Sequence, residues 1–396
     1  MENELVIILL PEPNPVVVEM EFMAAEKPVV LITGIAGLIG ARLAEACAAH
    51  YRVVGLDVKH PPWEIAGADF LGCDLTKDES VVRALTLVRE MYGNQLASVI
   101  HLASHDDFSA APSPLYHTLT VEGTQRLLRG LRDFEVGQFV FSSTLLVMKP
   151  VEDEDEVITE WSPVDEADKT WDYPRSKIEA ERVIKQEWRR ERGNIPVVIL
   201  RIAGVYNEDC HSIPIALQIS RIYEKRLESY VFPGDAGHGQ AFTHLDDLVD
   251  AFLRVIELRH ELGQYEVFLI AEPDVMSYAD LQDQIGELLY GVEWPTIRIP
   301  KVVAKAGAWA QENILSIWRQ ETFIKLQILR MVDLADMRYP VEIERARKRL
   351  GWEPGHRLRD TLSKMIGSLM EDPRRWYEAN KLAPPGKEKR KHAKAK

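Results

Sequence analysis

The segment from Val29 to Asp57 constrains the fold more than any other part of the chain. It starts with a short apolar run, passes through three glycines spaced GxxGxxG into an Ala- and Leu-rich stretch, and ends with a second apolar run. Short apolar runs bounded by glycine are typical of strands buried on both faces. The glycines are Gly34, Gly37 and Gly40. We therefore predict a strand–helix–strand unit with the glycines at its first turn.

This order of elements suits a dinucleotide. Glycines let the backbone turn tightly and approach a pyrophosphate, which then binds the N–H groups of the helix N-terminus. Asp57, at the end of the second strand, can accept hydrogen bonds from both ribose hydroxyls of an adenosine and would repel a 2′-phosphate. The alternative is a glycine turn used only for packing. The order of the elements favours NAD binding over a packing turn, because a strand, the glycines, a helix, a second strand and an acid follow one another.

The composition narrows the class of protein. The 396 residues suffice for one large domain or two smaller ones. A net charge of −14 argues against a nucleic-acid-binding protein. The cysteines, Cys47, Cys73 and Cys210, form no CxxC pair, so we expect a reducing cytoplasm and neither disulfides nor a metal site. No run approaches the roughly 18 apolar residues that a membrane span needs.

A third strand end adds to the predicted cofactor site. The segment 67–76 reads as a short strand that ends at Asp74 and Leu75. A carboxylate at this position could bind an adenine amino group. The alternative is a cap on the helix predicted over 80–92. The residues alone leave both interpretations open.

The next buried strand is predicted over residues 97–103. Ala103 and Ser104 at its end are small and would leave room for a cofactor to cross the strand ends. His101 lies within the apolar run, where a lone histidine is more often simply buried than a ligand. A helix over 114–131 follows this strand.

A strand and a helix carry the predicted chemistry. The strand FVFSST ends with Ser142, Ser143 and Thr144. About thirty residues later, Tyr173 and Lys177 lie four apart, hence on one face of a predicted helix. A tyrosine titrates near pKa ~10. An ammonium one turn away and a nicotinamide cation would lower that pKa, so the tyrosine becomes a general acid/base while a Ser or Thr hydroxyl holds the substrate oxygen.

The Tyr-x-x-x-Lys spacing occurs a second time, at Tyr377 and Lys381. No SST strand precedes that copy, and we interpret it as an exposed helix pair, although Trp376 and Tyr377 are apolar enough to pack back onto the domain. The position of Tyr173 after the glycine motif and the fifth strand makes it the catalytic candidate.

Seven short motifs recur in the order typical of one family. They are TGIAGLIG, CDLT, HLAS, FSST, YPRSK, VVILRIAGVY and FTHLDDLVDAF. From about residue 28 to residue 366 the chain resembles the extended short-chain dehydrogenase/reductase family, and more narrowly its NAD-dependent epimerase/dehydratase branch. The resemblance implies an α/β fold, with a Rossmann-type doubly wound parallel sheet and a smaller C-terminal substrate-binding domain.

The resemblance also implies a division of the chain and a set of site residues. The divisions are 1–27 (N-terminal extension), 28–206 and 241–271 (NAD-binding domain), 207–240 and 272–370 (substrate domain) and 371–396 (C-terminal extension with a basic tail). The implied cofactor contacts are Gly34, Gly37, Leu38, Ile39, Gly40, Asp57, Asp74, Leu75, Leu102, Ala103, Ser104, Tyr173 and Lys177. The implied catalytic residues are Thr144, Tyr173 and Lys177.

Departures from the family pattern bear on the substrate. Thr144 is followed by Leu145 and Leu146, where sugar 4,6-dehydratases have an Asp-Glu pair, so no acid is placed there to expel water. Thr120 replaces the family's Asn before VEGT. Gly204 stands where nucleotide-sugar enzymes often carry an Asn that touches the diphosphate. These differences argue against a dehydratase and leave the nucleotide-sugar question open.

The sequence therefore predicts a cytoplasmic, NAD-dependent enzyme acting on a hydroxyl or ketone of a small molecule. A sugar-nucleotide epimerase or dehydrogenase is preferred because such enzymes are common in the family. The alternatives are a dehydrogenase or reductase of a more apolar alcohol or ketone, and an NAD-binding scaffold without turnover. A homodimer is a family expectation. Residues 300–339 read as two amphipathic helices for core or lid packing, with a hydrophobic substrate mouth or peripheral contact with a membrane as the alternatives.

Overall fold

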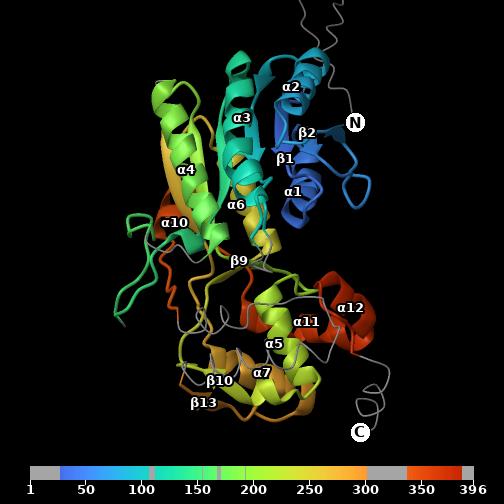
Figure 1. Cartoon of the computed structure of the whole chain (residues 1–396), viewed down its shortest axis with the longest axis vertical. Coiled ribbons are helices and arrows are strands. Elements are labelled where there is room, and N and C mark those ends of the chain that lie inside the picture. The colour runs from blue at the N-terminus through green and yellow to red at the C-terminus, as the bar shows by residue number, and fades with distance from the viewer. Residues whose placement is uncertain are drawn as a thin grey trace, which may run out of the picture.

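A seven-stranded parallel sheet forms the centre of the upper region in Figure 1. The computed structural model describes residues 27–106, 112–153, 155–166, 171–191, 193–300 and 337–385. In sheet order the strands are β12 (Tyr265–Ile270), β8 (Val197–Ile202), β7 (Phe139–Thr144), β5 (Ser98–His101), β1 (Val29–Thr33), β2 (Arg52–Asp57) and β3 (Ala68–Gly72). From β1 the chain builds outward to β3 on one side and to β12 on the other. The predicted doubly wound Rossmann-type sheet is confirmed.

The central strands are buried because helices cover both faces of the sheet. Along β1, Val30 and Ile32 pack into one hydrophobic cluster and Leu31 into another, as the alternation of a strand requires. The first cluster includes α1 (Leu38–Ala48), α6 (Leu245–Glu257) and α10 (Glu344–Leu350). The second includes α2 (Asp78–Tyr92), α3 (Glu122–Gly130) and α4 (Asp172–Arg190), which stand side by side in Figure 1.

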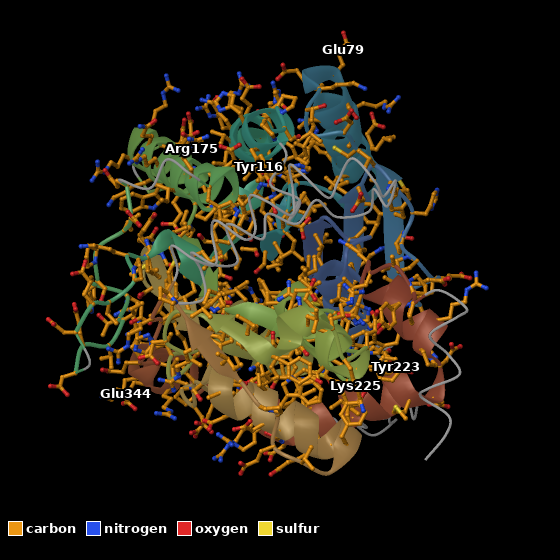
Figure 2. All side chains as sticks on the ribbon, turned by 60° about the horizontal axis from the view of Figure 1, so that its bottom comes forward. Glu79, Tyr116, Arg175, Tyr223, Lys225 and Glu344 are labelled. Atoms are coloured by element: carbon orange, nitrogen blue, oxygen red, sulfur yellow. The ribbon has the colours of Figure 1, made fainter. Side chains whose placement is uncertain are left out.

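A second, mainly helical region lies below the sheet in Figure 1 and has its own hydrophobic cluster. Its helices are α5 (Ile213–Tyr223), α7 (Tyr278–Tyr290), α11 (Leu358–Glu371) and α12 (Pro373–Ala379). Its strands pair as β9 (Gly204–Tyr206) with β11 (Phe242–His244) and β10 (Val231–Pro233) with β13 (Ile297–Ile299). In Figure 2, Tyr223 and Lys225 mark this region, and Tyr116 and Arg175 mark the helices over the sheet. The domain boundaries drawn from the resemblance stay a prediction.

Short elements complete the described chain and refine several predicted boundaries. They are β4 (Gln95–Leu96), β6 (Glu135–Val136), a π-helical turn (Tyr116–Val121) and 3-10 turns (Leu131–Asp133, Leu145–Val147, Leu227–Tyr230). The helix predicted over 114–131 is therefore π-helical in its first part. The strand predicted over 67–76 ends at Gly72, so Asp74 follows the strand instead of closing it.

The second Tyr-x-x-x-Lys copy is not the exposed helix pair that its spacing suggested. The side chain of Tyr377 is buried, and its hydroxyl donates to Glu224 at 2.9 Å. Lys381 lies beyond the end of α12 in a left-handed conformation, with φ of 56°. Trp376 and Tyr377 pack into the hydrophobic cluster of the helical region, as expected for aromatic side chains of this size.

The two regions are joined by buried carboxylates. Tyr206 Oη donates to Glu272 Oε1 at 2.5 Å, and the backbone N–H of Leu358, which opens α11, donates to Glu272 Oε2 at 2.9 Å. Beside them, the Asp247 carboxylate accepts from the N–H and Nδ1 of His356 at 2.9 and 2.8 Å. These bonds fasten the start of α11 to the edge of the sheet.

Replacing Glu272 with glutamine should flatten the dependence of stability on pH. Burial raises the pKa of Glu272 from 4.5 to about 7. The stability linked to this proton is therefore complete below pH 4.5 and is lost as the pH rises through 7. A glutamine keeps partners for both Tyr206 and Leu358 without a charge. Urea unfolding at pH 5 and pH 8 should show the wild type losing about 2 kcal/mol more than Glu272→Gln.

The exposed Glu79 at the start of α2 gives a matched control for this comparison. Glu79→Gln should keep the wild-type difference between pH 5 and pH 8, because an exposed carboxylate gains little from the fold. If the free energy of unfolding changes equally between pH 5 and pH 8 in the wild type and in Glu272→Gln, the Glu272 proton does not contribute to stability.

Three sequence predictions fall outside the described residues. They concern the N-terminal extension up to residue 26, the two amphipathic helices within 301–336, and the basic tail from 387 to 396. Where the structure is described, none of the helices is both long and apolar enough to cross a membrane.

Candidate active site

The glycine turn packs directly against the end of β5. Gly34 has φ of 79°, and a Cβ there would lie 2.8 Å from the backbone nitrogen of Ala103. A Cβ on Gly40 would lie 2.2 Å from the carbonyl oxygen of Gly34. Gly37 is exposed at the N-cap of α1 and offers no side chain to the N–H groups of Leu38 and the two residues after it. The helix N-terminus is therefore open to an anion.

Asp57 stands beside this turn. Its Oδ2 accepts from the N–H of Ala36 at 3.0 Å and its Oδ1 from the N–H of Lys59 at 3.2 Å. These two bonds hold the carboxylate at the carboxyl end of β2, next to the open helix N-terminus. An open helix N-terminus held close to the turn by Gly34 and Gly40, with a fixed carboxylate beside it, fits the pyrophosphate and adenosine ribose of NAD.

Asp74 and Leu75 lie in the turn after β3. Asp74 Oδ1 accepts from the N–H and the hydroxyl of Thr76 at 3.0 and 2.6 Å, and Oδ2 faces Lys77 Nζ at 3.0 Å. The Thr76 hydrogen bonds lower the pKa of Asp74. The N-cap residue of α2 is Lys77, and no side chain makes a capping hydrogen bond there. Asp74 is therefore not the cap of this helix, and that alternative is wrong. Adenine contact by Asp74 and the buried Leu75 stays a prediction.

His101 is buried, as expected, and joins β5 to its neighbours. Thr124 Oγ1 donates to the carbonyl of Thr120 at 2.6 Å, so it accepts from His101 Nε2 at 2.9 Å. Thr33 Oγ1 accepts from the N–H of Ala103 at 3.3 Å, so it donates to His101 Nδ1 at 2.7 Å. One neutral tautomer satisfies every bond, and burial lowers the pKa of His101 to about 3.

The predicted catalytic side chains meet at the end of β7. The Thr144 hydroxyl lies close enough to Tyr173 to act on the pKa of the phenol, and it accepts from the N–H of Leu146 at 3.3 Å. Lys177 Nζ donates to the carbonyl of Ser142 at 2.7 Å and lies 6.0 Å from the centre of the Tyr173 ring. Because the carboxyl ends of parallel strands share one edge of the sheet, this cluster lies on the same edge as the glycine turn, Asp57 and the half-buried residues 102–104.

The direction of the tyrosine pKa shift differs from the sequence expectation. The protein's own groups raise the pKa of Tyr173, because burial and the charge of Asp106 outweigh the opposing effect of Thr144. Burial also lowers the pKa of Lys177 to about 8, opposed by the charges of Asp106 and Glu181. Spacing along a helix carries no information on burial, which is the dominant cause of both shifts.

Two charged residues near this cluster were missed by sequence reasoning. Asp106 follows the HLAS motif and acts electrostatically on both Tyr173 and Lys177, but no spacing marks it. Glu181 does have a signal, because it lies four residues after Lys177 on the same helix face.

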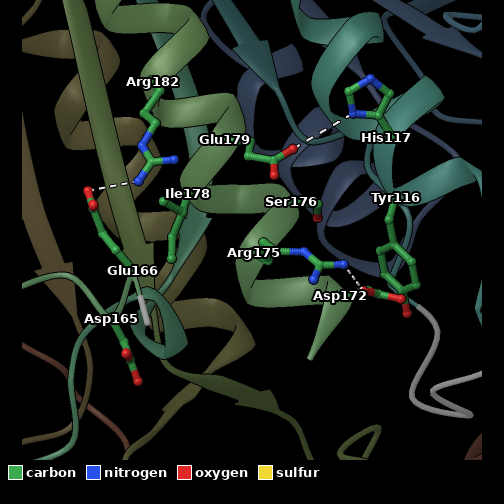
Figure 3. Close-up of a pocket in the computed structure, with 10 residues that line it drawn as sticks. All are labelled: Tyr116, His117, Asp165, Glu166, Asp172, Arg175, Ser176, Ile178, Glu179 and Arg182. Carbon is green, nitrogen blue, oxygen red and sulfur yellow. Dashed lines mark hydrogen bonds and ion pairs between the residues drawn. The ribbon is translucent and has the colours of Figure 1, made fainter. Parts of the chain in front are cut away.

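A cavity of about 420 Å³ opens on the flank of α4 and is lined by charged side chains. Figure 3 shows Glu179 turned toward His117 and Arg182 toward Glu166, with ion-pair distances of 3.7 and 2.8 Å. Thr144, Tyr173 and Lys177 are absent from its lining. The cavity is therefore separate from the candidate catalytic cluster.

Comparisons with known proteins identify the family of this chain. The model of the NAD dependent epimerase/dehydratase family matches residues 30–271. An uncharacterized UDP-glucose epimerase, YtcB, of Bacillus subtilis (strain 168) is 24% identical over 253 residues, which are 59% of this chain and 74% of that protein.

Solved structures share the fold. MoeE5 in complex with UDP-glucose and NAD is 22% identical with a TM-score of 0.62, covering 87% of this chain and 99% of that one. The UDP-glucose 4-epimerase of Thermotoga maritima with UDP-glucose is 20% identical with a TM-score of 0.61, at the same coverages of 87% and 99%. This chain belongs to the NAD dependent epimerase/dehydratase family, the extended short-chain dehydrogenase/reductase enzymes whose cofactor is NAD.

Proposed function

We propose that this protein is a sugar-nucleotide epimerase in which Tyr173, Lys177 and Thr144 carry the proton chemistry. The observation that carries the proposal is the meeting of three side chains at the end of β7: Lys177 Nζ binds the carbonyl of Ser142 at 2.7 Å and lies 6.0 Å from the centre of the Tyr173 ring, and Thr144 stands close to the Tyr173 hydroxyl. The similarity to UDP-glucose epimerases supports the substrate class.

Each side chain has a separate task. Tyr173 Oη takes the proton of a substrate hydroxyl and later returns it, and Thr144 Oγ1 holds the same substrate oxygen. The Lys177 ammonium group stabilises the tyrosinate, which buried surroundings alone would disfavour. NAD held here would supply the acceptor for a hydride, and its nicotinamide charge would favour the tyrosinate further. Gly34, Asp57 and the N-terminus of α1 hold the cofactor.

A second candidate is a dehydrogenase or reductase of a more apolar alcohol or ketone. Gly204 starts β9, and a Cβ there would lie 2.7 Å from the Phe242 ring. The ring therefore takes the space of a polar side chain at this position. Leu145 and Leu146 add apolar surface after Thr144, where dehydration would need an acid.

The cofactor content of the purified protein tests these candidates. An epimerase takes and returns the hydride within one turnover, so we expect about one NAD per chain to be released on denaturation, and interconversion of UDP-glucose and UDP-galactose. Reversible binding of added NAD, with no interconversion, would favour the dehydrogenase or reductase. Failure to bind NAD or NADP would contradict both candidates.

A further inference from the structure

Consecutive residues at the end of β7 contact α4. The carbonyl of Ser142 accepts from Lys177 Nζ at 2.7 Å. The next residue, Ser143, donates its hydroxyl to Glu181 Oε1 at 2.5 Å. The last residue of the strand, Thr144, lies close enough to Tyr173 to act on the pKa of its hydroxyl. One stretch of three residues thus meets the helix at three places, and Glu181 makes the contact farthest along α4.

Arg201, on the neighbouring strand β8, also binds Glu181. It pairs with Ser143 in the register of β7 and β8, so both side chains point to the same face of the sheet. Its Nε and Nη2 donate to the two oxygens of Glu181 at 3.2 and 2.8 Å, and its Nη1 contacts Met148 Sδ at 3.0 Å. The side chains of Arg201 and Glu181 are only 8% and 12% exposed.

We propose that Glu181 is a positioning residue for Tyr173 and Lys177. It fixes α4 against the ends of β7 and β8, and its negative charge keeps the buried Lys177 protonated. Only the effect of Glu181 on turnover rests on the proposed function. The geometry and the charge of Lys177 can be measured without substrate.

The physical argument has two parts. A bidentate pair between Arg201 and Glu181 fixes the relative position of two elements better than a single contact does, because both the distance and the rotation are constrained. A buried ammonium group is costly to maintain, and a carboxylate one turn away offsets part of that cost. Burial brings the pKa of Lys177 down to about 8, and the charges of Asp106 and then of Glu181 oppose the fall.

The test is the pKa of Lys177 in Glu181→Gln, measured by NMR with ¹³Cε-labelled lysine and assigned through Lys177→Arg. Removing the negative charge disfavours the ammonium form, so we expect Lys177 to titrate about one pH unit lower than in the wild type. The alkaline limb of kcat should move by the same amount. At pH 7, kcat should fall about tenfold with little change in NAD affinity.

Three further variants separate position, charge and folding. Ser143→Ala removes one bond to Glu181 and keeps its charge, so kcat should fall with no change in the alkaline limb. Glu181→Gln/Arg201→Gln removes both charges, so no buried guanidinium is left unpaired if the single variant fails to fold. Glu179→Gln, on the other side of α4, should match the wild type in every measurement.

Each outcome has one meaning. An unchanged Lys177 pKa in both Glu181 variants, or an equal shift in Glu179→Gln, overturns the proposal. A shifted Lys177 pKa in a protein that shows no turnover of any substrate contradicts the proposed function and supports the role of Glu181.

Discussion

Tyr173→Phe is expected to lower kcat by about 10³-fold and to leave the affinity for NAD within about twofold of the wild type. Phenylalanine keeps the ring, so the packing around α4 is preserved, and only the hydroxyl beside Thr144 is lost. The variant lacks the oxygen that is proposed to exchange a proton with the substrate, so the general acid/base step is lost. Steady-state kinetics and a fluorescence titration with NAD measure the two quantities.

Tyr377→Phe is the matched control, because it removes a buried hydroxyl from the other Tyr-x-x-x-Lys copy. Its bond to Glu224 lies in the helical region, so stability should fall by about 1–2 kcal/mol and kcat should stay within about twofold. Undiminished kcat in Tyr173→Phe, or an equal loss in both variants, would remove Tyr173 from the mechanism.

The fold could be predicted because local signals and burial agree along the first half of the chain. A strand buried on both faces needs a run of apolar residues, and β1 has one from Val29 to Ile32 before the buried Thr33 at its end. Boundaries were less certain, because a strand ends where its neighbour stops pairing. Gly72 pairs with Asp57, the last residue of β2, so β3 ends there. The residues that follow, up to Asp74, show no change in the sequence pattern that would mark this end.

In the candidate site, the sequence predicts only the contacts that follow from spacing along one helix. A separation of four residues puts Tyr173, Lys177 and Glu181 on one helix face. What that face meets depends on tertiary structure, and the register that sets Ser143 beside Arg201 leaves no local trace in the sequence. The charge of Asp106, more than sixty residues before Tyr173, reaches the site for the same reason.

Gly40→Ala is expected to weaken NAD binding by at least about 100-fold and to lower the free energy of unfolding by about 3 kcal/mol. In an ordinary helix, alanine would stabilise by up to about 1 kcal/mol relative to glycine. Here the added Cβ would lie 2.2 Å from the Gly34 carbonyl oxygen and 2.8 Å from Ile35 Cα, both backbone atoms that cannot rotate away. The methyl group must push α1 off the turn, which displaces the N–H groups proposed to bind the pyrophosphate.

Gly72→Ala supplies the control for this prediction, because a Cβ there meets nothing within 4 Å and the residue ends β3 on the same edge of the sheet. Its unfolding free energy should stay within about 0.5 kcal/mol of the wild type, and its NAD affinity should not change. If Gly40→Ala unfolds in urea and binds NAD as the wild type does, the turn tolerates displacement of α1. Close packing of the helix on Gly34 would then contribute nothing to the cofactor site, and Asp57 would have to account for NAD binding without it.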